Sequence, residues 1–391
     1  MLTPLFYNVY WFEDYILLLE HKDALYAANI FIDYFSSIDR IDEYLRRIKL
    51  GRIAEMGCSL PGMGPEEEMF SDFSMHPQDM DFKILEPDNE KFMRYLEITT
   101  SHAIESSVPG KSLRWMIKET NSDKIVGFIR IGSPTINSKP RNDFLGKPLD
   151  TQSPEVMKRF NDSCIMGFII VPTQPFGFNY LGGKLLAGLC CSHEMRERMN
   201  QKYNMNVCMF ETTSLYGSTK SSSQYDGMKP FLRYKGNTDS NFAPLLNDDN
   251  YRKLNEWFIN KNNGELLVHE NASSRKLKTQ TKMASIIKSS LKTTDPDAYK
   301  KFCKSFDDAK NITEKKRQYM SDYGFSNVKE YMNLETDVLT KKENFDRFNT
   351  EGIVEWWKNK ASSRYETLKT ENRLRTEPEL WTLNSDIDII R

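Results

Sequence analysis

The 391-residue sequence contains no apolar run of the roughly 18 residues that a membrane-spanning helix needs. Its first residues also lack the basic, apolar and small-residue order of a secretory signal peptide. The six cysteines include no CxxC pair and the five histidines are scattered singly, so neither a disulfide framework nor a metal site is predicted. We therefore expect an intracellular, cytoplasmic protein with no membrane partner and no bound metal.

Apolar and charged residues are both plentiful, but the charges are unevenly distributed. Hydrophobic residues make up 39% of the chain, which is enough for a substantial core, and the length fits two or three domains. Residues 1–100 contain 9 basic and 19 acidic side chains, whereas residues 271–320 contain 13 basic and 5 acidic ones. The second imbalance predicts a basic surface for an anionic polymer, with an ordinary solvated helix face as the alternative.

The periodicity of the apolar residues divides the chain into three regions. Over 1–81 it predicts an N-terminal helical hairpin, which Gly51 would end, and from 59 an acidic linker or surface loop rich in Pro and Gly. Over 82–246, strand-like runs alternate with helical ones. Over 247–391 the pattern predicts a C-terminal helical region, locally basic, in which 271–295 forms a flexible basic segment.

The middle region holds the predicted sheet. Strands are expected at 82–87, 112–120, 124–134, 164–171, 206–215 and 232–237. The helix expected over 181–203 would connect strands 164–171 and 206–215 by a crossover, so these two should be parallel and the others antiparallel. The predicted fold class is α/β, a mixed sheet with flanking helices, to which the helical hairpin and the C-terminal helical region are added.

The junction "VPTQPFGFNYLGGKLLAGL", residues 171–189, combines backbone freedom with few side chains. One interpretation is a helix packed tightly against the sheet. The other is a set of free backbone amides that hold a phosphate at the start of a helix, beyond the end of a central strand. Candidate cofactor-binding residues are Val171, Gln174, Gly177, Asn179, Gly182, Gly183 and Lys184.

The strand order and this junction resemble the GNAT acyltransferase fold. In that fold the fourth strand leads through a Q/R-x-x-G-x-G/A loop, whose amides hold the pyrophosphate of coenzyme A. Gln174 and Gly177 match the first two motif positions, and Asn179 replaces the second small residue. The resemblance implies a GNAT-like core that binds acetyl-CoA or another acyl-CoA.

A narrower resemblance, to the DruA-like proteins of Druantia anti-phage systems, covers about 125–238. Their R-D-x-x-I-G segment is matched by Arg141, Asp143 and Gly146, and their E-T-F-V and later motifs are matched by Glu211, Thr212, Gly217, Ser218, Tyr225 and Gly236. Thr213-Ser214 and Pro230-Phe231 depart from the family pattern. The family is similar in predicted fold to the phage Mom proteins, so the resemblance implies modification of a nucleic-acid base.

Roles for the matched residues follow from their chemistry. Glu211 ends an apolar strand, where burial would raise its pKa and suit it as general base, and Tyr225 could protonate a leaving thiolate. Arg141, Asp143 and Ser218 are candidate substrate contacts. The structural alternatives are a turn cap for Glu211, ordinary packing for Tyr225, and an ion pair between Arg141 and Asp143.

For the C-terminal region, Lys276, Lys278 and Lys282 are candidate phosphate contacts in a nucleic-acid interface. The alternative is a helical appendage that packs through Trp356, Trp357 and Trp381. The predicted function is an acyl-CoA-dependent N-acyltransferase that modifies a nucleic-acid base in a phage or anti-phage context. The alternative is a non-catalytic DNA-binding or protein-interaction module on the same fold.

Overall fold

The computed structural model describes residues 17–56, 64–102, 110–215, 222–238, 245–272, 275–312 and 316–390. The chain forms two compact units, one drawn from Met1–Ser37 and Leu245–Ala309 and the other from Ile38–Pro244 and Lys310–Arg391. This division differs from the three consecutive regions expected from the sequence, because the first unit joins segments from the N-terminal and C-terminal regions. No helix in the described ranges is long and apolar enough to cross a bilayer.

The first unit is helical. Its helices are α1 (His21–Ser36), α11 (Asp248–Lys261), α12 (Arg275–Thr294) and α13 (Pro296–Lys310). Phe31 of α1 packs with the rings of Phe302 and Phe306 of α13, at centroid distances of 5.8 and 5.3 Å. The prediction of a flexible basic segment at 271–295 is wrong over α12, because its apolar residues recur at helical spacing and Met283, Ile287 and Leu291 are buried.

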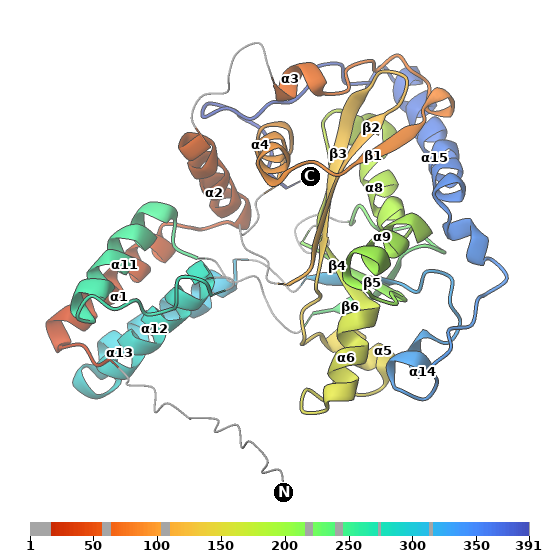
Figure 1. The fold of residues 1–391 in the computed structure, drawn as a ribbon. Helices are drawn as coiled ribbons and strands as arrows, with labels where there is room; N and C mark the ends of the chain where they lie inside the picture. Colours follow the sequence, from red (N-terminus) through yellow and green to blue (C-terminus); the bar gives the residue numbers. More distant parts are fainter. Residues whose placement is uncertain are drawn as a thin grey trace, which may run out of the picture. The chain divides into compact units, whose positions relative to one another are not determined.

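The second unit contains a seven-stranded sheet in the order β1-β2-β3-β4-β5-β7-β6 (Figure 1). Its strands are β1 (Phe82–Leu85), β2 (Ser112–Glu119), β3 (Lys124–Gly132), β4 (Cys164–Pro172), β5 (Met209–Ser214), β6 (Arg233–Asn237) and β7 (Arg317–Ser321). Among the strand pairs of the described ranges, β4–β5 alone is parallel. The predicted mixed sheet and its parallel pair are therefore confirmed.

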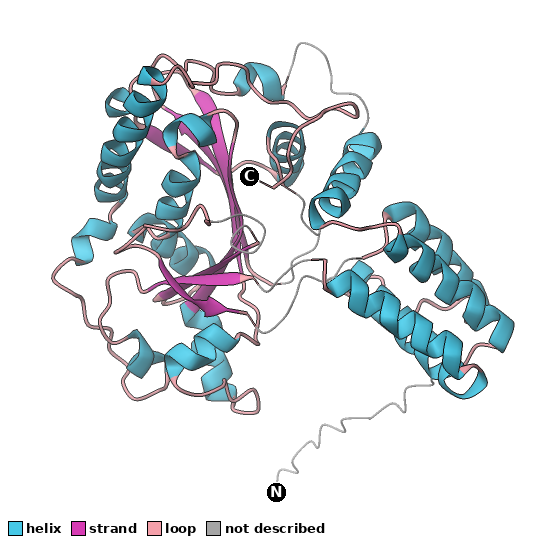
Figure 2. Cartoon of the chain, turned by 180° about the vertical axis from the view of Figure 1, so that it is seen from behind, coloured by secondary structure: helices cyan, strands magenta, loops and turns pink. Residues whose placement is uncertain are grey.

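Helices cover the two faces of this sheet (Figures 1 and 2). The helix α4 (Asn89–Thr99) lies on one face, and α8 (Gly182–Cys190), α9 (His193–Tyr203) and α15 (Thr350–Thr370) lie on the other. Phe92 of α4 stacks edge-on against Phe128 at 5.6 Å, which identifies the first side, hereafter the α4 face. Leu186 of α8 reaches Gly127 from the opposite side, hereafter the α8 face.

Further helices belong to this unit. They are α2 (Ile41–Met56), α3 (Pro65–Glu68), α5 (Lys139–Leu145), α6 (Pro154–Ser163), α7 (Phe176–Tyr180) and α14 (Val328–Met332), with 3-10 turns at Pro77–Asp79 and Phe345–Phe348. Buried Lys49 of α2 donates to Glu97 of α4 at 2.9 Å, which attaches α2 to α4. Contrary to the prediction, α2 continues past Gly51, so the N-terminal helix does not end there.

Two other predictions about the elements are wrong. Residues 317–321, assigned to a C-terminal helix, form β7, which lies between β5 and β6 and pairs with both. The described part of the predicted linker buries Phe70, Phe73 and Met80 in the main core. Both segments are held by partners distant in sequence, which local periodicity does not reveal.

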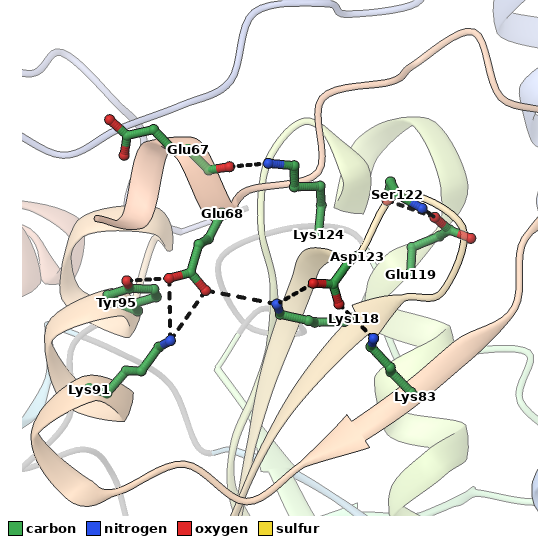
Figure 3. Close-up of polar contacts among 10 residues, drawn as sticks. All are labelled: Glu67, Glu68, Lys83, Lys91, Tyr95, Lys118, Glu119, Ser122, Asp123 and Lys124. Carbon is green, nitrogen blue, oxygen red and sulfur yellow. Dashed lines mark hydrogen bonds and ion pairs between the residues drawn. The ribbon is translucent and has the colours of Figure 1, made fainter. Parts of the chain in front are cut away.

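Around the turn between β2 and β3, charged side chains of this hairpin form polar contacts with one another and with α3, which in turn contacts α4 (Figure 3). Lys118 lies 3.9 Å from the carboxylate of Glu68 and 3.3 Å from that of Asp123. The buried carboxylate of Glu119 accepts hydrogen bonds from the backbone and side chain of Ser122, both at 2.7 Å. Each of these charged groups has a partner, as satisfied polar groups in a stable fold do.

Candidate functional site

The candidate site is the region where β4 and β5 separate. Their ladder joins Cys164–Gly167 to Met209–Thr212, although β4 continues to Pro172. Beyond Gly167, the side chain of Gln224 donates to the carbonyl of Ile170 at 3.4 Å, so a later loop covers the open edge of β4. The junction predicted to hold a diphosphate follows directly.

Three amides of the junction, those of Gly177, Phe178 and Asn179, are used within the protein. The amides of Gly177 and Asn179 donate to the carbonyls of Thr173 and Pro175, both at 2.9 Å. The amide of Phe178 donates to the side-chain oxygen of Gln174 at 3.0 Å. These three amides belong to α7, a one-turn helix that occupies the position of the expected phosphate-binding loop. The prediction that they are free is therefore wrong.

The junction's glycines serve close packing. A Cβ added at Gly177 would lie 2.5 Å from the Gln174 amide nitrogen and 2.6 Å from Pro172, and one at Gly182 would lie 2.7 Å from the ring of Phe176. At Gly183, an added Cβ would meet the side chain of Gln224 at 2.3 Å. Distances this short leave no room for a side chain, so the first interpretation of the junction, a tightly packed helix, is supported.

Other predicted cofactor residues also have partners inside the fold. Lys184 donates from Nζ to the backbone carbonyls of Gln224, at 3.0 Å, and Asp226. Fully buried Asn179 donates to the carbonyl of Arg375 at 2.7 Å and accepts from its amide at 3.1 Å. Val171 packs in the small core beneath α4. The C-terminal segment and the loop at 222–228 thus close over this region.

Glu211 and Arg141 form a buried ion pair on the α4 face. The guanidinium of Arg141 donates to Glu211 Oε2 at 2.9 Å and to the carbonyl of Thr135 at 2.8 Å, and it stacks on the ring of Phe160. Burial raises the pKa of Glu211 to about 7, against the opposing influence of Arg141. The predicted direction of this pKa shift is confirmed. The predicted Arg141–Asp143 pair is wrong, because Asp143 pairs with Lys139 at 2.6 Å.

Tyr225 lies on the opposite side of the sheet from Glu211. Successive residues of a strand face opposite sides and directly paired residues face the same side. Glu211 pairs with Met320, whereas Thr212 pairs with Tyr319, so Tyr319 points to the other face. Tyr225 packs edge-on against Tyr319 at 5.3 Å. The structure therefore does not bring the predicted base and acid together.

The remaining predicted contacts are dispersed. Ser218 lies outside the described residues. Lys276, Lys278 and Lys282 belong to α12 of the other unit, where Lys276 pairs with Asp248 and Lys278 and Lys282 are exposed. Two cavities of the second unit are lined by Met209, Arg233 and neighbours and by Arg159, Ser163 and neighbours. Neither cavity is lined by a predicted site residue.

Sequence reasoning missed two arginines on the α4 face. Arg114 of β2 and Arg130 of β3 are directly paired across the strands, and Arg130 is only 4% exposed. A signal was present, because each is a cation flanked by apolar residues within a strand, in "SLRWM" and "GFIRIG". A charge at such a position is costly without a partner.

One comparison with known proteins gives a match. Residues 73–221 match the family described as Druantia protein DruA, which confirms the DruA-like resemblance over rather less than half of the chain. The match includes both Arg141 and Glu211, so the two motif positions that form the buried ion pair lie inside it. No curated protein and no solved structure matches the chain.

Proposed function

Starting from the DruA-like region at 73–221, we propose that this is an anti-phage protein that binds nucleic acid and does not transfer acyl groups from coenzyme A. Of the two functions predicted from the sequence, we favour the non-catalytic nucleic-acid-binding module over the acyltransferase. The GNAT-like description of the core stays part of the proposal, supported by the parallel β4–β5 pair and the separation of these strands beyond Gly167 and Thr212.

The hydrogen bonds made by backbone amides within the junction at 171–189 argue against the acyltransferase. A diphosphate needs several unpaired amides at a helix start, and those of Gly177, Phe178 and Asn179 already donate to acceptors in the protein. Binding there would have to break these bonds and displace the segment that Asn179 holds. The separation of Glu211 and Tyr225 onto opposite faces removes the second requirement, a base and an acid at one reacting centre.

Exposed lysines support nucleic-acid binding. In α12, Lys278 and Lys282 are one helical turn apart on the solvent side, and Lys292 is exposed further along the helix. Lysines gain affinity for a phosphate backbone by releasing its counterions, without any base contact. A binding module of this kind needs no recognisable base-reading motif.

Calorimetric titration of coenzyme A and acetyl-CoA into the full chain tests the choice. We expect no saturable heat for the wild type or for Gly177→Trp. Saturable binding by the wild type that Gly177→Trp abolishes would contradict the proposal and restore the acyltransferase interpretation.

A DNA titration tests whether the protein binds nucleic acid through α12. We expect random duplex DNA to bind with an affinity that falls steeply with salt. Replacing Lys276, Lys278 and Lys282 with Gln should reduce the slope of log K against log salt by up to about 3. The matched control replaces exposed Lys147, Lys202 and Lys369 of the other unit with Gln, which changes the net charge equally. An identical loss in both triple variants would show a bulk charge effect and no interface on α12.

A further inference from the structure

Arg114 and Arg130 form a pair of like charges. They are direct cross-strand neighbours in an antiparallel ladder, where Cβ atoms are about 5 Å apart and like charges repel. Among the described residues, neither guanidinium has a hydrogen-bond or ion-pair partner, and the Nε of Arg114 is buried. A guanidinium stays charged in a protein, so the pair has a desolvation cost that no acceptor in the described part of the chain offsets.

Arg114 and Arg130 lie at the margin of the small apolar core beneath α4. Met116 and Phe128, two residues away on the same strands, belong to that core together with Phe92 of α4. Residues two apart on a strand share a face, so both arginines point to the α4 face immediately beyond this apolar cluster. Arg114 is partly exposed, which gives solvent and solutes a route to the pair.

Further unpaired polar atoms lie nearby. The buried Oγ of Ser112, two residues before Arg114 on the same face, has no partner in the described structure. The buried Nε2 of His102, which follows α4, likewise has none. Burial lowers the pKa of His102 to about 3, so this imidazole is neutral; Glu97, Lys49 and Arg52 influence it more strongly than Arg130 does.

An aromatic ring flanks the same spot. A Cβ added at Gly132, the next residue on this face after Arg130, would meet the ring of Phe168 at 3.1 Å. Phe168 is partly exposed. A cationic pair beside an accessible ring is the combination with which proteins hold the backbone and stack the bases of single strands.

We propose that Arg114 and Arg130 bind a phosphate group on the α4 face of the sheet. Two guanidiniums present planar pairs of donors that match phosphate oxygens, and a doubly charged or bridging anion would cancel the repulsion between them. Ser112 and His102 supply further polar atoms at its margin. The view that this phosphate belongs to a nucleic acid rests on the proposed function, whereas the site itself does not.

The experiment uses the full chain and four proteins: wild type, Arg114→Met, Arg130→Met and the control Arg198→Met. Arg198 is on α9, on the other side of the sheet, where it pairs with Glu86. Each protein is titrated calorimetrically with inorganic phosphate and with a single-stranded thymidine oligonucleotide of about ten nucleotides. Melting temperatures are measured without either ligand.

We expect the wild type and Arg198→Met to bind with equal affinity. Arg130→Met and Arg114→Met should weaken binding by about tenfold or more, the loss of one charge-assisted contact, while the melting temperature of Arg130→Met stays level or rises. Loss of phosphate binding with unchanged oligonucleotide affinity would keep the site and assign it to a small phosphate ligand. Phosphate binding that needs Arg130 in a chain that binds no DNA would overturn only the proposed function.

The proposal is overturned if the wild type binds neither ligand, or if Arg130→Met binds both as the wild type does. Failure of Arg130→Met to fold would also contradict it, because that result would mean the guanidinium has a structural partner. Arg130→Lys keeps the charge without the planar donor pair and should retain weakened binding.

Discussion

Arg141 and Arg130 are two arginines buried against the same face of one sheet, and they differ in their partners. Arg141 has a carboxylate, backbone carbonyls and an aromatic ring around its guanidinium. Arg130 has a second arginine beside it and no acceptor in the described structure. Arg141 therefore stabilises the fold through its contacts. Burial of the Arg130 charge costs free energy, and the described structure supplies no contact that offsets this cost.

The largest effect is expected from removing Arg141, the arginine that has a carboxylate and two carbonyl groups as acceptors. At a pH above the Glu211 pKa of about 7, Arg141→Met leaves the ionised Glu211 buried without its cation and two carbonyl groups without their donor, so the free energy of unfolding should fall by about 3–5 kcal/mol. Chemical denaturation monitored by tryptophan fluorescence measures it. A double variant, Arg141→Met with Glu211→Leu, should recover much of the loss. A loss below about 1 kcal/mol for the single variant would contradict the structural role of Arg141.

A second test concerns the protonation state of Glu211, the carboxylate that pairs with Arg141. Because burial raises the pKa of Glu211 to about 7 from a usual 4.5, the folded protein keeps a proton that the unfolded chain releases between those values. The contribution of Glu211 to stability is therefore complete below about pH 4.5 and is lost as the pH rises toward 7.

Glu211→Gln cannot ionise, so its unfolding free energy should change less across this window than that of the wild type, by about 1–3 kcal/mol. Denaturation curves between pH 4.5 and 7.5 give the difference. Parallel profiles for the two proteins would show that Glu211 is ionised throughout and that the pair is a full salt bridge.

A third, smaller effect extends the comparison to a neutral buried group. Asn179→Ala removes two hydrogen bonds to the backbone of Arg375 and should cost about 1–2 kcal/mol. The released C-terminal segment should also be cleaved faster by protease. The control is Asn349→Ala, because Asn349 is exposed and its side chain makes no cap hydrogen bond. Equal effects in both variants would contradict the anchoring role of Asn179.

The sequence was sufficient for elements with strong local patterns. The hairpin of β2 and β3 follows from two apolar runs around "NSD", and Asp88 is an ordinary N-cap residue for α4, with its carboxylate accepting from the amide of Lys91 at 2.8 Å. The β4–β5 parallel pair follows from the length of the connection between the strands. These features depend on neighbours in the chain, which periodicity reports.

The site was less predictable because it depends on distant partners. Glycine and proline in 171–183 favour tight packing and phosphate binding equally, and only the hydrogen-bond partners of Gly177, Phe178 and Asn179 separate the two. Arg141 and Glu211 were each recognised, but their pairing needs α5 to lie over β5. In β7, "RQYMS" acquires strand structure from β5 and β6, more than 75 residues earlier in the chain.

The most direct measurement compares the unfolding free energies of Arg130→Met, Arg141→Met and the wild type in one phosphate-free buffer. We expect Arg141→Met to lose about 3–5 kcal/mol, whereas Arg130→Met should lose nothing or gain stability. A loss in Arg130→Met as large as that in Arg141→Met would contradict this expectation, since Arg130 would then be a structural residue like Arg141.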